Sequence, residues 1–353
     1  MNFINESKIS NDKKINNNES IKNSTSTNTS SNQDTNIYFY QNELTKKSIL
    51  SCLNAQNTAI ILQRIISEAS KEVIDNIVNE LKGTYRELIK DKNGNYFCSD
   101  LFKMCEKAQR IKILNELSKT ICEDSTHKFA TYPIQILIEF SSSEEEYKLI
   151  LYSFHDYKQL ILTTFDSCGS YVINKIIEHI PEKFRYQFNL LFIAIIPLIS
   201  LKQFGVCCCK KFISFTTNEE IIEKMINIII KNFIKISTNN FGNFLIQFIL
   251  KKLNNTRQGE RIKEEIINNY KDLSENKYSF YICDLFLKLA SNEDIKKIII
   301  IHNINPYNIK NNNNQILDQK NFGQFFLGHN INLLGQNHIP FSLNNTNFKE
   351  NYK

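Results

Sequence analysis

The spacing of apolar and polar residues in the stretch 241–250, FGNFLIQFIL, predicts one amphipathic helix. At about 100° of rotation per helical residue, four apolar side chains share one arc of this helix: Leu245, Ile246, Ile249 and Leu250. Asn243, Phe244 and Gln247 fall outside that arc. The two amides are four residues apart, so we expect them to stand one above the other on the outer face, beside the ring. The stretch therefore predicts a core-packed helix that exposes two amides and one aromatic ring.

This arrangement recurs eight times, with about 36 to 39 residues between most neighbouring copies and a longer gap before the last. Each copy has a small residue, called the slot, then a first read position, a stack position directly after it, and a second read position four residues after the first. The first read positions are Ala59, Asn95, Thr131, Ser170, Val206, Asn243, Phe280 and Gln324. The stack positions are Ile60, Tyr96, Tyr132, Tyr171, Cys207, Phe244, Tyr281 and Phe325. The second read positions are Gln63, Ser99, Gln135, Asn174, Lys210, Gln247, Asp284 and Gly328. Such a period predicts a stacked helical array rather than one compact fold.

Each of these read helices is expected to be followed by a second amphipathic helix that faces away from them. Three such helices show an N-terminal signal, a hydroxyl residue three positions before a carboxylate: Ser143 with Glu146, Thr217 with Glu220, and Ser291 with Asp294. These carboxylates are interpreted as helix caps rather than as a catalytic pair.

Charge, cysteine usage and the lack of catalytic motifs argue against a metalloprotein or an enzyme. The net charge of the 353 residues is +6 and the pI is about 8.7, a modest positive charge for a nucleic-acid binder. The nine cysteines lack the paired spacing of a zinc site, so we interpret them as reduced thiols in an intracellular protein. No nucleophile–base set and no phosphate-cradling glycine loop is evident. No enzyme, no metal and no cofactor is therefore expected.

Three stretches set the domain limits. Residues 1–36 are rich in Asn, Ser and Thr and are expected to be disordered, and residues 37–353 are expected to form the repeat domain with its terminal caps. Ile49, Leu50 and Leu53 have helical spacing and are expected to cover the open end of the first repeat. The most apolar stretch, 190–200, is too short for a membrane span and is expected to be a buried helix.

Several of these segments together resemble the eight-repeat RNA-binding domain of the Pumilio (PUF) family. They are GNYFCSDLF (94–102), ATYPIQILIE (130–139), CGSYVINKIIEHI (168–180), FGVCCCKKFI (204–213), FGNFLIQFIL (241–250), KYSFYICDLF (277–286) and NFGQFFL (321–327). The resemblance extends from about residue 40 to the end of the chain. It implies a right-handed, crescent-shaped α-solenoid of eight repeats that binds single-stranded RNA, reading about one base per repeat.

The resemblance also implies roles for individual residues. Base-edge contacts are expected from Gln63, Asn95, Ser99, Thr131, Gln135, Ser170, Asn174, Asn243, Gln247, Asp284 and Gln324. Stacking is expected from Tyr96, Tyr132, Tyr171, Phe244, Tyr281 and Phe325. Contacts to the RNA backbone are expected from Arg64, Lys175, Lys210 and Lys211, for which a solvated surface role is the alternative.

The match to the family's base-reading pairs is uneven. Asn243 with Gln247 matches the pair that reads uracil, because an amide offers both a donor and an acceptor to the uracil edge. Asp284 keeps an acid where the family's guanine reader has a glutamate, but Phe280 replaces its serine. Val206 and Lys210 can make neither amide contact. The family's UGU preference is therefore expected to be relaxed.

The leading hypothesis is a post-transcriptional regulator of mRNA, a cytoplasmic and monomeric protein that represses translation or promotes decay through proteins of translational repression or deadenylation. One alternative is a degenerate helical-repeat scaffold that binds protein partners, and another is a structure-tolerant RNA binder in ribosome assembly. Selection of RNA from a random pool distinguishes them, because the leading hypothesis alone predicts an enriched motif with uracil opposite the sixth repeat.

Overall fold

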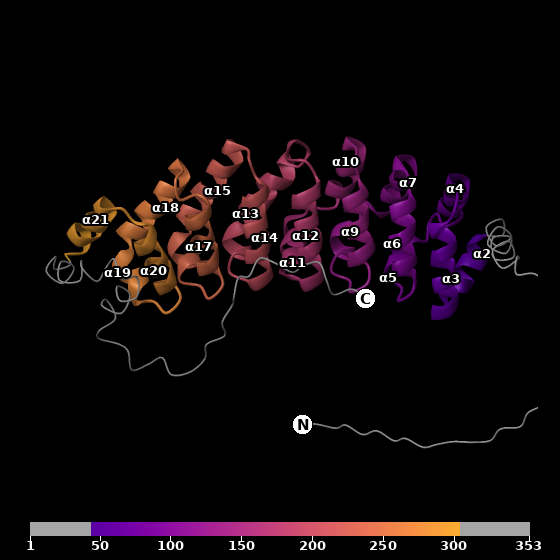
Figure 1. The fold of residues 1–353 in the computed structure, drawn as a ribbon, viewed down its shortest axis with the longest axis horizontal. Helices are drawn as coiled ribbons and strands as arrows, with labels where there is room; N and C mark the ends of the chain where they lie inside the picture. Colours follow the sequence, from indigo (N-terminus) through magenta and orange to yellow (C-terminus); the bar gives the residue numbers. More distant parts are fainter. Residues whose placement is uncertain (1–43, 304–353) are drawn as a thin grey trace, which may run out of the picture. The chain divides into compact units, whose positions relative to one another are not determined.

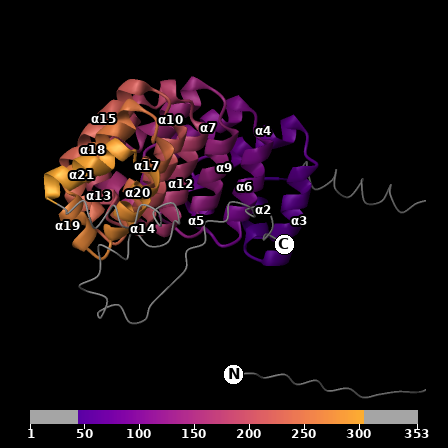
Figure 2. The ribbon, with the colours of Figure 1, turned by 60° about the vertical axis from the view of Figure 1, so that its left-hand side comes forward.

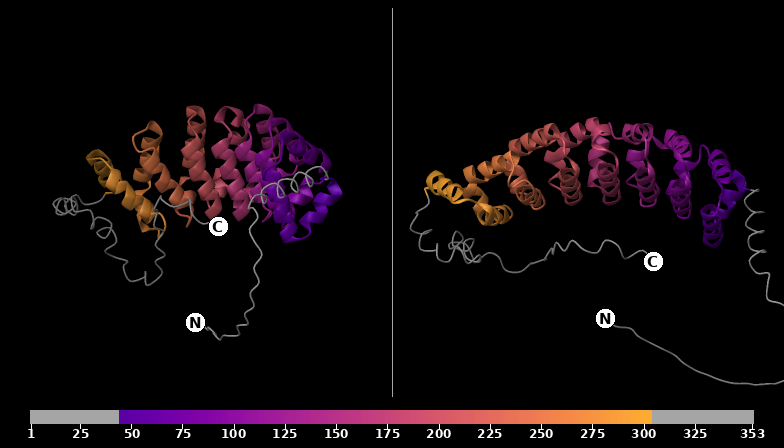
Figure 3. Two further views of the ribbon diagram at one scale, coloured as in Figure 1. Left: turned by 45° about the vertical axis from the view of Figure 1, so that its right-hand side comes forward. Right: turned by 45° about the horizontal axis from the view of Figure 1, so that its top comes forward.

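The computed structural model describes residues 44–303, and within that range the chain consists of helices without a strand. The predicted all-α solenoid is confirmed. In Figure 1 the helices of this range follow one another as a series of similar layers, from α2 (Lys46–Leu53) to α21 (Asn292–His302). Figure 2 shows the same layers from the side, and in the right-hand view of Figure 3 they follow an arc.

The layers contain three rows of helices. The read helices are α3 (Gln56–Ser67), α6 (Gly94–Met104), α9 (Thr131–Phe140), α12 (Ser167–His179), α14 (Gln203–Phe215), α17 (Gly242–Lys252) and α20 (Phe280–Leu289). The outer helices are α4 (Lys71–Glu80), α7 (Lys107–Leu117), α10 (Glu144–Tyr152), α13 (Tyr186–Ile199), α15 (Glu219–Lys231), α18 (Arg257–Asn268) and α21. The short helices, which precede read helices, are α5 (Tyr85–Lys90), α8 (Ile121–Asp124), α11 (Tyr157–Phe165), α16 (Phe233–Ser237) and α19 (Tyr270–Glu275). A 3-10 turn, η1 (Glu182–Phe184), precedes α13.

The expectation of two helices per repeat was wrong, because a short third helix precedes most of the read helices. Most of these helices span only four to six residues, as α16 does with Phe233–Ser237, and such lengths contain too few turns for a periodic pattern. The long α13 has no separate short helix after it, and its last residue, Ile199, packs against the next read helix in the same way.

The apolar faces predicted for the read helices form the core. Leu245, Ile246, Ile249 and Leu250 of α17 are all fully buried. The apolar stretch 190–200 lies mostly in α13, where Phe192, Ile193, Ile195, Ile196 and Ile199 are buried, so it is a core helix as expected. No helix within residues 44–303 is both long enough and apolar enough to cross a membrane.

The terminal predictions are tested only in part. The expected entry helix is α2, which packs on α3 and buries Ile49 and Leu53. The predicted tail (1–36), the boundary at residue 37 and the eighth copy, with Gln324, Phe325 and Gly328, lie outside the described residues.

Two of the three predicted caps have the expected hydroxyl. Ser291 and Asp294 form the reciprocal capping box at the start of α21, and the Ser143 hydroxyl accepts from the Glu146 backbone N–H. Thr217 was wrongly predicted as a cap. The Asn218 side chain caps α15 instead, because the Thr217 hydroxyl donates to Glu182 of the preceding repeat.

The slot residue brings each short helix close to the following read helix. A Cβ added to Gly242 would lie 2.3 Å from the carbonyl oxygen of Ile236, six residues earlier, and the slot glycines of α6, α12 and α14 face the same obstacle. In α20 the slot is Ser279, whose hydroxyl donates to the carbonyl of Leu273 over 2.7 Å. The slot is thus a glycine in four repeats and a hydroxyl residue bonded to the carbonyl six residues earlier in two, Thr58 and Ser279, whereas α9 has Ala130 there.

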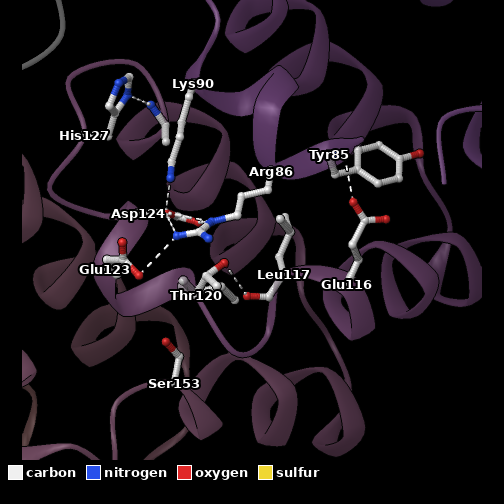
Figure 4. Close-up of polar contacts among 12 residues, drawn as sticks. Tyr85, Arg86, Lys90, Glu116, Leu117, Thr120, Glu123, Asp124, His127 and Ser153 are labelled. Atoms are coloured by element: carbon white, nitrogen blue, oxygen red, sulfur yellow. Dashed lines mark hydrogen bonds and ion pairs between the residues drawn. The ribbon is translucent and has the colours of Figure 1, made fainter. Parts of the chain in front are cut away.

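Ion pairs link neighbouring repeats on the side of the short helices. Asp124 of α8 lies between Arg86 and Lys90 of α5 in Figure 4, and Arg86 Nε is 3.0 Å from Asp124 Oδ2. Burial alone would raise the pKa of Asp124, but the hydrogen bonds from Arg86 and Lys90 outweigh burial and lower that pKa. The carboxylate therefore stays charged and holds the two repeats together.

The outer row has a second link of this kind. Arg110 of α7 and Glu146 of α10 are both buried, with Arg110 Nε 2.7 Å from Glu146 Oε1. Burial would raise the pKa of Glu146, but bonds from the Ser142 backbone, the Ser143 hydroxyl and Arg110 lower it below its ordinary value of 4.5. Arg261 and Glu223 join α18 to α15 over 2.6 Å in the same row. Repeats are thus connected by charge as well as by apolar packing.

Replacing Gly242 by alanine is expected to lower the free energy of unfolding by about 1–3 kcal/mol, because the new Cβ has to push α16 away from α17. Gly242→Ser is expected to cost less, since its hydroxyl can donate to Ile236 as Ser279 does to Leu273. Urea unfolding measures both variants. An alanine variant as stable as the parent would show that the close contact is not tight.

Glu146→Gln is expected to lower the free energy of unfolding by about 3–5 kcal/mol, because Arg110 is left as a buried charge without a partner. Glu144→Gln, which alters an exposed pair with Lys148, serves as the control and is expected to have a far smaller effect. Since the pKa of Glu146 is lowered by folding, its stabilisation is present above pH 4.5 and is lost as the pH falls through the folded-state value. Equal stability of the two variants at pH 7 would contradict this assignment.

Candidate nucleic-acid interface

The stack positions form an exposed row along the read helices. Their aromatic side chains have exposed fractions between 46% and 62%: Tyr96, Tyr132, Tyr171, Phe244 and Tyr281. Ile60 and Cys207, which occupy the same position in α3 and α14, are exposed as well. The prediction that these rings lie outside the core is confirmed. Large exposed rings at one step per repeat provide flat apolar surfaces for stacking.

A hollow lies between the first two members of this row. Ile60 and Gln63 of α3 and Tyr96 of α6 line it, together with Phe129 from the turn before α9. An amide and an aromatic ring therefore lie at the edge of one hollow.

The first read positions are not on the outer face, contrary to prediction. Six of the seven within the described range are buried: Ala59, Asn95, Thr131, Ser170, Val206 and Asn243. Each stands in the first turns of its helix, where the preceding short helix or outer helix packs over the slot next to it. The helical wheel counted only the core of the read helix itself, so it could not show this additional cover.

The buried asparagines use their amide nitrogens inside the protein. Asn243 Nδ2 donates to the carbonyls of Asn239 (2.9 Å) and Asn240 (3.1 Å). Asn95 Nδ2 makes the same two bonds, to Asp91 and Lys92. The nitrogens are therefore occupied by backbone carbonyls in this state. In α17 the side-chain oxygen of Asn243 faces the second read position, Gln247.

The second read positions within the described range are half-buried. Two glutamines among them are each hydrogen-bonded to the first read position of the same helix. Gln247 Nε2 donates to Asn243 Oδ1 over 2.8 Å, and Gln135 Nε2 donates to Thr131 Oγ1 over 3.0 Å. The predicted stacking of the two amides in α17 is thus confirmed as a direct hydrogen bond. Each glutamine keeps its side-chain oxygen and one N–H, which are an acceptor and a donor for a base edge.

The remaining read positions are less uniform. The Ser99 hydroxyl donates to the Asn95 carbonyl, and the Ser170 hydroxyl donates to the Ser167 carbonyl. Asp284 is paired with Lys288 over 2.7 Å. Asn174 Oδ1 is buried and has no hydrogen-bond partner among the described residues.

A row of caps that the sequence interpretation missed fixes the read helices at their N-terminal turns. Three residues before the slot, a side-chain acceptor receives two backbone N–H groups in five repeats. The capping residues are Asp91, His127, Asp166, Asn239 and Asn276. Lys202 and Ala55 stand at this position in the other two repeats and provide no cap. The recurrence of Asp, Asn or His at a fixed distance before the slot was the signal available in the sequence.

The cations predicted to contact an RNA backbone are mostly engaged with carboxylates. Lys175 pairs with Glu139 and Lys211 pairs with Glu178, each over 2.8 Å, so both cations link neighbouring read helices. Arg64 pairs with Glu68 of its own helix. Lys210 differs, because its ammonium lies over two aromatic rings of α17.

Among the described residues no group of His, Cys, Asp or Glu has the arrangement of a metal site. Most of the thiols are buried, and burial raises the pKa of Cys105 and of Cys122 to about 12. Such thiols stay protonated and are unsuited to nucleophilic chemistry.

The comparisons with known proteins agree with this geometry. The sequence profile of the Pumilio-family RNA binding repeat matches residues 61–82, 85–118, 165–188 and 232–267. A Pumilio domain-containing protein of Schizosaccharomyces pombe is 26% identical over 220 residues, which are 62% of this chain and 32% of that protein. Pumilio homolog 12 of Arabidopsis thaliana is 26% identical over 201 residues, which are 56% of this chain and 33% of that protein. The chain thus spans about a third of the length of these relatives.

Solved structures share the fold. The RNA-binding domain of yeast Puf5p, bound to SMX2 RNA, superposes with a TM-score of 0.66 at 22% identity and covers 79% of this chain and 81% of its own. The Puf4 RNA-binding domain, bound to an HO endonuclease 3′ UTR recognition sequence, gives a TM-score of 0.64 at 23% identity and covers 78% of this chain and 84% of its own.

His127→Ala is expected to lower the free energy of unfolding by about 1 kcal/mol, because the Phe129 and Ala130 N–H groups lose their acceptor. His127→Asn is expected to retain stability, since Asn239 and Asn276 fill the same position. Thermal unfolding of both variants measures the difference. If asparagine cost as much as alanine, the imidazole would act through packing on Phe129 and not as a cap.

Proposed function

Because this chain belongs to the Pumilio family, we propose that its row of read helices binds single-stranded RNA, with bases between the exposed rings and their edges at the second read positions. The observation that carries the proposal is the regular exposure of stack positions at one per repeat beside a half-buried polar side chain. This spacing matches the way PUF-type repeats read one base each. The family match and the fold of the RNA-bound relatives support it.

The affinity is expected to come from stacking and base edges more than from charge. Lys175 and Lys211 are already neutralised by carboxylates, and the net charge of the whole chain is only +6. Stacking of a base on an aromatic side chain contributes about 1–3 kcal/mol, so several rings in a row suffice for tight binding. The interface is therefore suited to unpaired RNA, whose bases are accessible, rather than to a duplex.

Uracil is the base proposed opposite α17. The oriented Gln247 offers an acceptor for the uracil imide N–H and a donor for a carbonyl oxygen, and Asn243 holds it in place. Specificity of the UGU type is proposed to be relaxed, because Phe280 and Asp284 depart from the family's guanine reader.

The biological role proposed from family membership is regulation of mRNA in the cytoplasm, by repression of translation or promotion of decay through protein partners, with the protein as a monomer. The described residues offer no metal cluster, and the role proposed here is binding rather than catalysis.

Replacing both Asn243 and Gln247 by alanine is expected to cost about 1–3 kcal/mol of binding free energy for the preferred RNA and to relax discrimination at one base. The reason is that the donor and the acceptor offered to one base edge are both lost. Equilibrium binding to single-base variants of an RNA selected by the intact protein measures this. Asn227→Ala on the outer helix α15 is the matched control, and it should leave the base preference unchanged. Unchanged binding of the double variant to every single-base RNA would reject the assignment.

A further inference from the structure

The fifth repeat departs from the common pattern at four positions at once, and the first repeat shares the first three of these departures, at Ala55, Ala59 and Ile60. Its read helix α14 has no side-chain cap at Lys202, and its first read position, Val206, is buried and apolar. Cys207 replaces the ring at the stack position, and Lys210 replaces the amide or acid at the second read position. No base edge can form a paired donor–acceptor contact with these side chains, since the lysine ammonium is a donor only.

Lys210 lies against aromatic rings of the sixth repeat, one of which is the stacking ring of the proposed function. Its ammonium is 5.6 Å from the ring centre of Phe244 and 5.9 Å from that of Phe248, both on the neighbouring α17. Because Lys210 reaches these rings from α14, it covers the face of Phe244 that turns toward the fifth repeat. A base opposite the fifth repeat therefore lacks a ring on one side, at Cys207, and meets a cation on the other.

Lys210 is also available for a phosphate. It is half-buried and makes no ion pair with a carboxylate among the described residues, whereas its neighbour Lys211 is paired with Glu178. Burial lowers the pKa of Lys210, and the nearby Lys251 acts in the same direction while Cys207 opposes it. An approaching phosphate would be the first anion to compensate this poorly solvated charge.

We propose that the fifth repeat does not read a base and that Lys210 instead binds the RNA phosphate at that step. The bound RNA then has one position without sequence preference, between the nucleotides read by the fourth and the sixth repeats. This inference rests on the proposed RNA-binding function and adds to it a residue that controls where the sequence is read.

The experiment uses the intact chain and an RNA obtained by selection. The nucleotides opposite the fourth and sixth repeats are assigned first, by the loss of preference in Asn174→Ala and in Asn243→Ala with Gln247→Ala. The nucleotide between them is then varied as A, C, G, U and an abasic residue. The five RNAs are expected to bind within about threefold of one another, because neither stacking nor an edge contact distinguishes them.

Lys210→Met, which removes the ammonium without adding a base-reading amide, is expected to weaken all five RNAs by a similar factor, about three- to tenfold, and to reduce the slope of log affinity against log salt by about 0.7, the effect of one phosphate contact on a single strand. Lys210→Arg should retain both values, and Lys235→Gln, an exposed lysine on the short helix α16, controls for the loss of one positive charge. Circular dichroism confirms that each variant is folded.

A converse variant supplies the missing groups. Val206→Asn with Cys207→Phe and Lys210→Gln recreates the side chains of the sixth repeat, and it is expected to prefer uracil at that position and to lose about tenfold or more with the abasic RNA. A tenfold preference of the parent protein for one base at that position would overturn this inference but not the proposed function. A Lys210→Met variant with unchanged affinity and salt slope would do the same. Selection that enriches no RNA would reject the proposed function together with it.

Discussion

The close contact between each short helix and the first turn of the next read helix decides which side chains this protein exposes. At Gly242 the Ile236 carbonyl leaves no space for a Cβ, and in α20 the Ser279 hydroxyl bonds the corresponding carbonyl of Leu273. This contact covers the residue after the slot, so the first read position is buried while the next residue points outward. The stack position is thereby exposed in a fixed register along the read helices, with a ring in five of the described repeats.

The same contact gives the two read positions different roles, because it buries the first and leaves the second half-exposed. Asn243 is held by two backbone carbonyls and presents its oxygen to Gln247, and Thr131 holds Gln135 in a similar manner. The first position therefore orients the second, which keeps an acceptor and a donor for a ligand in Gln247 and Gln135. Preorganisation of this kind reduces the entropy lost on binding, because the glutamine side chain is already fixed.

Charge in this protein mainly connects repeats rather than attracting a ligand. Ion pairs join neighbouring repeats in all three rows of helices. They are Asp124 with Arg86 between short helices, Glu146 with Arg110 between outer helices, and Lys175 with Glu139 between read helices. In a solenoid each repeat contacts only its neighbours, so such links and the apolar faces together hold the array in one curvature. A fixed curvature keeps the distance between adjacent rings constant, which a ligand with regularly spaced bases requires.

The sequence by itself determined the helical repeats, their spacing and the exposed rings, because these follow from the local periodicity of apolar residues such as Leu245 and Ile249. It also indicated Gln247 as a ligand-facing side chain. Only the tertiary structure decided that Asn243 is buried, that a short helix precedes most read helices, and that Lys210 covers the ring of Phe244. These features depend on contacts between helices of different length and between neighbouring repeats, and no periodicity within a single helix records such contacts.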